Sequence, residues 1–151
     1  MTALILRAAI ITLLIIAAFG VRWAYAGFVV LSLTSFFAKA GFQVVSPSCE
    51  LLVGPDLALY SFRNYPHIVL FAVFFLLSRM QFKGPHAYSL AMVATLVMGM
   101  LVELAEGFSG QGHCRLRDML PNTAGAIIGA LVFAGGKRGW QQLFVRSHGN
   151  G

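Results

Sequence analysis

Long apolar runs, separated by short polar segments, dominate the pattern of hydrophobic and polar positions along the chain. A helix that crosses the hydrocarbon core of a membrane needs roughly 17–25 predominantly apolar residues. Four runs approach that length: residues 3–19, 65–77 (to 82 if the charge of Arg79 reaches the head groups), 87–106 and 119–136. The pattern therefore predicts an all-α, polytopic transmembrane helix bundle.

A fifth apolar stretch, residues 27–42, contains several polar side chains and Lys39. It is either another span or a segment at the membrane interface, so we expect four to five spans. The N-terminal run resembles a secretory signal, with Arg7 ahead of an apolar core and a small-x-small motif behind it. We interpret it as a membrane anchor that is retained.

The composition indicates a membrane rather than an aqueous environment. Hydrophobic residues make up 58% of the 151 residues and charged residues 11%, whereas soluble domains carry about 25% charged residues. A transmembrane β-barrel alternates apolar and polar positions along each strand, and the unbroken apolar run at residues 68–77 does not. We expect one transmembrane helical domain, residues 1–136, and a polar cytoplasmic tail, residues 137–151.

Charge asymmetry predicts the orientation. The polar segments 46–64 and 107–117 are two crossings apart and therefore lie on the same side of the membrane. This side carries Arg63, Arg115 and Arg117 together with all five carboxylates: Glu50, Asp56, Glu103, Glu106 and Asp118. The other side carries basic residues only: Arg79, Lys83, Lys137, Arg138 and Arg146. The positive-inside rule places the basic side and the C-terminus in the cytoplasm of a bacterial inner membrane, with the carboxylates facing the periplasm or exterior.

The net charge of +6 does not indicate nucleic-acid binding, because the basic residues are scattered at membrane edges and form no patch with exposed aromatics. Membrane lipids with anionic head groups are the partners we expect for the cytoplasmic basic residues. Cys49 and Cys114 both lie in the outward segments. They form either a disulfide, which an oxidising compartment permits, or two free thiols, because the sequence does not supply their Cα separation.

Polar and small residues share helix faces in the last two spans. In the span 87–106, one helix face carries Gly99, Glu103 and Glu106, spaced i, i+4 and i+7. In the span that follows, one face carries Asp118, Asn122, Gly125 and Gly129, spaced i, i+4, i+7 and i+11. Small residues at this spacing allow transmembrane helices to approach closely. We therefore expect the glycines to pack these two helices together and to bring the carboxylates near Asp118 and Asn122.

The connecting loop adds Arg115, Arg117 and His113, and His67 begins its own span at the same level. Each residue has a structural interpretation: Asp118 as a helix N-cap ahead of Pro121, and the carboxylates as groups neutralised by the arginines. Taken together, the set is better interpreted as a binding site, because polar groups are costly to keep inside a membrane.

The chemistry open to this set is limited by its residue types. Closely held carboxylates such as Glu103 and Asp118 can act as acid and base, and arginines bind phosphate through paired hydrogen bonds. No spacing of metal ligands such as His-x-x-x-His occurs, and no cofactor motif, so we expect neither a metal nor a cofactor.

The motif residues resemble the VanZ-like family. The resemblance is carried by Glu103-Leu104-Ala105-Glu106, by residues 112–125 with Arg115, Asp118, Asn122 and Gly125, and by Gly129, and covers about residues 64–133. The family shows a Glu-x-x-Gln pair at the end of one span, an arginine-containing loop, and Asp-x-x-x-Asn-x-x-Gly opening the last span. This chain has Glu106 at the Gln position, and it keeps His67 but not the Asp that the family tends to show upstream of it.

The resemblance implies a small helical inner-membrane protein with a role in the cell envelope, as for the member that assists resistance to the glycopeptide teicoplanin. It assigns no reaction. We expect the polar set to bind an anionic or lipid-linked head group, through Arg115 and Arg117. One alternative is a non-catalytic subunit or assembly factor of a larger membrane complex, with other membrane subunits as partners. The other is a hydrolase or transferase acting on a lipid, with Glu103 or Asp118 as general base.

Overall fold

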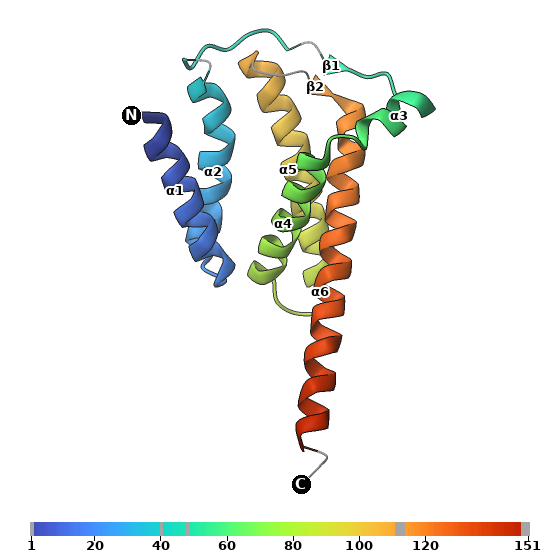
Figure 1. Ribbon diagram of the computed structural model, residues 1–151. Helices are drawn as coiled ribbons and strands as arrows, with labels where there is room; N and C mark the ends of the chain where they lie inside the picture. Colours follow the sequence, from blue (N-terminus) through green and yellow to red (C-terminus); the bar gives the residue numbers. More distant parts are fainter. Residues whose placement is uncertain (1, 40, 48, 111–113, 149–151) are drawn as a thin grey trace.

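The computed structural model describes residues 2–39, 41–47, 49–110 and 114–148, and the side chains of those from 4 to 137. The elements in chain order are α1 (Thr2–Ala18), α2 (Arg22–Lys39), β1 (Cys49–Glu50), α3 (Pro55–Ser61), α4 (Tyr65–Gln81), α5 (Ala87–Ser109), β2 (Cys114–Arg115), the 3-10 turn η1 (Leu116–Asp118) and α6 (Met119–His148). The regular secondary structure of these residues is helical, apart from the two short strands (Figure 1).

Helices α1, α2, α4, α5 and α6 run side by side in alternating directions, and the short α3 lies across one end of them (Figure 1). The chain reverses at Gly20, between α1 and α2, and at Gly84, between α4 and α5. Both glycines have positive φ, 79° and 92°, which glycine adopts at low cost. These two turns define the turn end of the bundle, and β1 and β2 define the opposite strand end.

All the apolar stretches of the sequence are helical. The ambiguous stretch, residues 27–42, falls mostly within α2, which lies antiparallel to α1 (Figure 1). The expected polar tail, residues 137–151, is not separate from the last helix: α6 continues without a break to His148. The segment 46–64, expected to be a loop, contains the short helix α3.

Within the described part of the chain, two helices are long and apolar enough to cross a membrane, Ala87–Ser109 and Leu116–Lys137. A third joins them if α3 and α4, which meet at a bend of 69°, count as one span. The helix Leu4–Ala18 is apolar but shorter. Length and composition thus give two spans, or three with the bent pair.

Helix α6 packs closely on α4 because Gly125 and Gly129 have no side chains. A Cβ atom at Gly125 would overlap the backbone carbonyl of Ile68, and one at Gly129 would lie 2.6 Å from the carbonyl oxygen of Ala72. The expectation that these two glycines face α5 is therefore wrong, since their neighbours belong to α4. Gly99 of α5 does face α6, where a Cβ would lie 3.1 Å from the Asn122 side-chain nitrogen.

The α1–α2 hairpin is attached to the other helices by hydrogen bonds near the turn end. The buried Gln81 side chain donates to the carbonyl oxygen of Ala17 at 2.8 Å. The hydroxyls of Tyr25 and Ser78 are 2.8 Å apart, and Ser78 also donates to Phe74 within its own helix. These contacts fix one end of the hairpin against α4.

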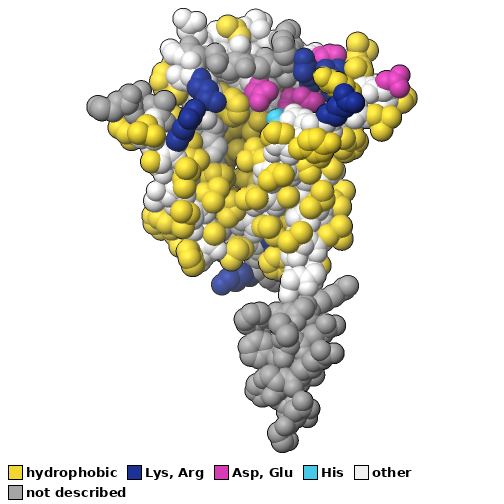
Figure 2. Space-filling model, in the orientation of Figure 1, with side chains coloured by type: hydrophobic (Ala, Val, Ile, Leu, Met, Phe, Trp, Pro, Cys, Tyr) yellow, Lys and Arg dark blue, Asp and Glu magenta, His cyan; other side chains and the backbone are white. Residues whose placement is uncertain are grey.

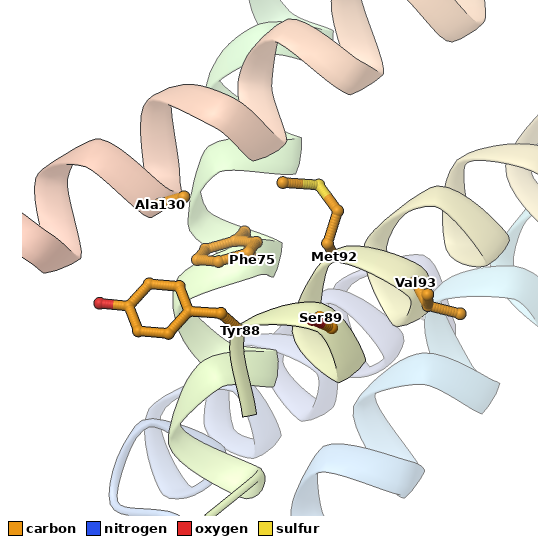
Figure 3. Close-up of a pocket in the computed structure, with 6 residues that line it drawn as sticks. All are labelled: Phe75, Tyr88, Ser89, Met92, Val93 and Ala130. Atoms are coloured by element: carbon orange, nitrogen blue, oxygen red, sulfur yellow. The ribbon is translucent and has the colours of Figure 1, made fainter. Parts of the chain in front are cut away.

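Arg79 holds a positive charge at the turn end. Its guanidinium lies 4.8 Å from the ring centroids of both Tyr88 and Phe133, and it donates a hydrogen bond to the carbonyl oxygen of Phe82 at 2.9 Å. An apolar groove of about 390 Å³ lies nearby, between α4, α5 and α6; it is lined by Phe75, Tyr88, Ser89, Met92, Val93 and Ala130 (Figure 3). A charge surrounded by aromatic rings in this way ties the three helices together.

Candidate functional site

A disulfide joins the two polar segments at the strand end. Cys49 and Cys114 are bonded, with their Cα atoms 4.6 Å apart and a sequence separation of 65. The same pair sets the register of two parallel strands, in which Cys49 lies opposite Cys114 and Glu50 lies opposite Arg115. The structure thus selects the bridge over two free thiols, and it fixes what lies beside the bridge.

Glu50 binds both arginines of the connecting loop. Its Oε1 accepts a hydrogen bond from Arg117 Nη1 at 3.0 Å, and its Oε2 lies 3.3 Å from Arg115 Nε. Arg117 is only 8% exposed. The arginines therefore pair with Glu50 rather than neutralising Glu103 and Glu106 through ion pairs.

Glu50 is the site residue that the sequence reasoning missed. It stands next to a cysteine in a segment expected to be a loop, and no helical spacing connects it to the other candidates. The signal was present in the cysteine pairing: once Cys49 is joined to Cys114, the residue after each cysteine becomes a neighbour, and these residues are Glu50 and Arg115.

Glu103 is buried at the centre of the site, with 4% of its surface exposed. Its Oε2 accepts a hydrogen bond from the backbone N–H of Arg115 at 3.0 Å. Its Oε1 has no hydrogen-bond partner among the described residues. A buried carboxylate oxygen without a partner is costly, and such an oxygen can accept a hydrogen bond from a bound molecule.

The half-buried His67 and the buried Asn122 form a hydrogen-bonded pair. The two side chains are 2.9 Å apart, with His67 Nδ1–H donating to Asn122 Oδ1. Asn122 is fully buried, and Gly99 leaves the space that its amide fills. This hydrogen bond orients the ring and leaves His67 Nε2 for contact with a ligand.

The remaining acidic candidates lie near Glu103 and His67. Asp118, at the end of η1, and Glu106, one turn beyond Glu103, are close enough to His67 and Glu103 to interact with them electrostatically. The structure thus gathers all the candidate binding residues and Glu50 into one group, the strand-end cluster: Glu50, His67, Glu103, Glu106, Arg115, Arg117, Asp118 and Asn122. His113 lies outside the described residues.

The strand-end cluster is acidic on balance, because four carboxylates accompany two arginines, both paired with Glu50. In Figure 2 the acidic and histidine side chains of the visible face gather at this end. Among the described residues, no three His, Cys, Asp or Glu side chains are placed to hold a metal ion. The cluster can accept hydrogen bonds from a ligand and can transfer a proton at His67 or at a carboxylate. It can bind an anion if Glu50 moves away from one of the arginines.

An open apolar cavity of about 210 Å³ reaches the cluster from the side of α5. Glu103 and Arg115 line it together with the disulfide and apolar side chains, namely Cys49, Leu51, Met100, Leu104, Cys114, Leu116 and Met119. Leu51 and Met100 are exposed, at 72% and 57%. We refer to this space as the disulfide cavity; it joins an exposed apolar surface to a buried carboxylate.

The contribution of the Glu50–Arg117 pair to stability can be measured. Glu50→Gln is expected to lower the free energy of unfolding by about 1–2 kcal/mol, because it leaves the buried Arg117 unpaired; the partial exposure of Glu50 keeps the loss below that of a fully buried pair. A double-mutant cycle with Arg117→Gln, followed by denaturant unfolding in micelles, measures the coupling. Asp56→Asn removes a carboxylate that makes no ion pair within the described residues and serves as the control. A coupling energy near zero would contradict the geometry.

Comparison with known proteins adds no relative: no family model matches the chain, and neither the curated proteins nor the solved structures searched contain a match.

Proposed function

We propose that the protein is a multi-pass protein of a bacterial inner membrane, with α1, α2, α4, α5 and α6 as five spans and the strand end outside. The separation of charge supports this topology. All five carboxylates lie in β1, α3, η1 or the last turns of α5, at the strand end, where Lys39, Arg63, Arg115 and Arg117 accompany them. The described charged residues at the turn end, Arg22, Arg79 and Lys83, are all basic. Basic residues at the ends of spans are retained in the cytoplasm. The VanZ-like motif residues, now neighbours in one cluster, support membership of that family as part of the same proposal.

We further propose that the strand-end cluster binds the polar head group of a lipid or lipid-linked molecule. The observation that carries this proposal is the Glu103 carboxylate, which is buried in the wall of the disulfide cavity with one oxygen unpartnered. A ligand hydroxyl or amine would satisfy that oxygen, and the exposed apolar side chains of the cavity would contact the hydrocarbon part. Burying both halves of an amphiphile in adjoining surfaces favours a lipid over a water-soluble ligand.

An anionic group on the same ligand would meet the two arginines. Because Glu50 occupies Arg115 and Arg117 in this structure, a phosphate would take the place of the Glu50 carboxylate. Arginine N–H groups bind phosphate and carboxylate oxygens alike, so a phosphate would replace the hydrogen bond to Arg117 and the ion pair with Arg115 that Glu50 makes here. Glu50 thus holds the arginines in position until a ligand arrives.

Native mass spectrometry of the protein extracted gently from its own membrane tests this function. The wild-type protein is expected to retain a lipid, and Glu103→Gln and Arg117→Gln are each expected to reduce its occupancy about tenfold, the effect of losing one charge-assisted hydrogen bond. Asp56→Asn, an exposed carboxylate on α3, is the matched control and should retain the lipid.

Two outcomes would count against head-group binding. One is a lipid complement that is the same in all four proteins. The other is a stoichiometric protein partner without a specific lipid, which would instead identify a subunit of a larger complex, with the cluster as structural support.

The orientation of His67 favours catalysis as the second candidate. Its Nδ1 is held by the buried Asn122, which orients the ring and leaves Nε2 for contact with a ligand, and Glu103 lies close to His67 and Asp118. A hydrolase or transferase acting on the bound lipid would use one of these groups as general base, an effect of about 10²–10⁴ in rate. His67→Gln and Asp118→Asn would then keep the bound lipid and lose its conversion to product; unchanged conversion in both variants excludes His67 and Asp118 as the general base.

A further inference from the structure

The apolar groove of about 390 Å³ between α4, α5 and α6 is open at the surface of the helix bundle. It is lined by one residue of α4, one of α6 and four from the first two turns of α5: Phe75, Ala130, Tyr88, Ser89, Met92 and Val93 (Figure 3). Val93 is 57% exposed, and Leu90 of α5 and Ile127 of α6 are also exposed. With these helices placed in a membrane as proposed above, the groove faces hydrocarbon rather than water.

Arg79 places a positive charge at the outer end of this groove. On α4, Arg79 follows Phe75 by four residues and therefore lies one turn closer to the turn end. Its guanidinium lies 4.8 Å from the ring centroid of Tyr88, which itself lines the groove. It lies equally close to the ring of Phe133, which follows Ala130 by three residues on α6. The apolar groove and the cation thus share Tyr88 and lie end to end.

No carboxylate side chain of the protein neutralises Arg79, because all five lie at the strand end. The charged residues that follow it on α4 and α6 are basic and exposed: Lys83, and Lys137 one turn beyond Phe133. Within the described part of the chain, Arg79 Nη1 donates to the carbonyl oxygen of Phe82, and Nε has no hydrogen-bond partner. Since an arginine stays charged in a protein, this end of the groove favours an anion.

We propose that the groove and Arg79 together bind an anionic phospholipid of the surrounding bilayer. One acyl chain lies along Phe75, Met92 and Val93, and the phosphate lies at the Arg79 guanidinium. Basic pockets between transmembrane helices bind anionic head groups, and the planar guanidinium matches the geometry of a phosphate. The inference rests on the proposed placement in a membrane, and it does not depend on head-group binding at the strand-end cluster.

The uncompensated charge favours a lipid over the other possible occupants of the groove. A second copy of this chain, or a helix of another membrane protein, would cover the apolar surface. A second copy would bring no carboxylate to the turn end, because its own five also lie at the strand end. The phospholipid supplies both the hydrocarbon and the negative charge in one molecule.

Native mass spectrometry with two added lipids tests the proposal. The probes are phosphatidylglycerol and phosphatidylcholine with the same acyl chains, the first anionic and the second without net charge. We expect the wild-type protein to bind phosphatidylglycerol about tenfold more tightly, the effect of one charge-assisted hydrogen bond. Arg79→Gln should remove this preference. Arg22→Gln, which removes an exposed positive charge from α2 at the same end, is the matched control and should keep it.

Filling the groove provides a second arm that leaves Arg79 in place. Ser89→Phe should lower the binding of both lipids severalfold, because its side chain occupies the path of the acyl chain. Leu90→Phe changes an exposed neighbour on the same helix, outside the lining, and should not. In the wild-type protein, phosphatidylglycerol with a diazirine on its acyl chain should label the peptides of α5 and α6 that line the groove.

Three results would overturn the proposal: equal binding of the two lipids by the wild-type protein, an unchanged preference in folded Arg79→Gln, or unchanged lipid binding in folded Ser89→Phe. If Arg79→Gln does not fold, Ser89→Phe and the labelled peptides decide. Labelling confined to the disulfide cavity would overturn this site and leave the proposed function intact. Conversely, Glu103→Gln should keep the lipid of the groove, so failure of the proposed function does not imply failure of this site.

Discussion

Gly125→Ala is expected to lower the stability of the helix bundle by about 3 kcal/mol or more, the upper end of the range for overpacked interiors. The added Cβ atom would overlap the backbone carbonyl of Ile68, and a backbone atom inside a helix cannot rotate away as a side chain can. The helices α4 and α6 would have to separate. Because His67 precedes Ile68, the same movement would lengthen its 2.9 Å hydrogen bond to Asn122.

The same helix offers a matched control. A Cβ atom at Gly135 would have no neighbouring atom within 4 Å, so Gly135→Ala should leave stability unchanged or raise it by up to about 1 kcal/mol through helix propensity. Thermal unfolding and the monodisperse fraction after extraction measure both variants. Equal stabilities of Gly125→Ala and Gly135→Ala would show that α6 does not pack on α4 as described.

Loss of the disulfide is expected to lower the stability of the helix bundle by an amount similar to that of Gly125→Ala. A bridge across 65 residues stabilises by up to about 4 kcal/mol in the loop-entropy account. The double variant Cys49→Ser/Cys114→Ser loses this stabilisation and also frees β1, so Glu50 is no longer held opposite Arg115. We therefore expect the coupling between Glu50 and Arg117 to weaken in the double variant.

Reducing agent separates the bridge from the substitutions themselves. It should lower the unfolding temperature of the wild-type protein to that of the double variant and leave the double variant unchanged. A wild-type protein whose unfolding is insensitive to reduction would show that the bridge does not stabilise the fold.

The helices of this fold are predictable from the sequence because each is a long apolar run. The uncertain one is α2, whose hydroxyl residues lower its hydropathy. In the structure, Thr34 and Ser35 donate to carbonyl oxygens of their own helix, those of Leu31 and Ser32. Hydroxyls that bond to their own helix in this way destabilise it little, so the polar residues of α2 are compatible with a helix. Its role as a span remains part of our proposal.

The partners of residues are harder to predict than the elements. The spacing of Gly125 and Gly129 correctly indicates a close approach, but a glycine face carries no information on which helix covers it, and here it is α4. Glu103 could be grouped with Glu106, and Asp118 with Asn122, because helical spacing relates the members of each pair. Glu50 could not, because its place depends on a covalent link between distant segments.

That link has a consequence for how the chain is inserted into a membrane. Cys49 precedes α4 and Cys114 follows α5, so in the proposed topology the two thiols reach the same compartment only when both helices cross, or when neither does. A chain with one of the two helices left out would keep a thiol on each side of the bilayer and could not be oxidised to the bridged form. In that topology, closure of the bridge would require that both helices have crossed or that neither has, and the closed bridge would prevent either helix from leaving the membrane alone.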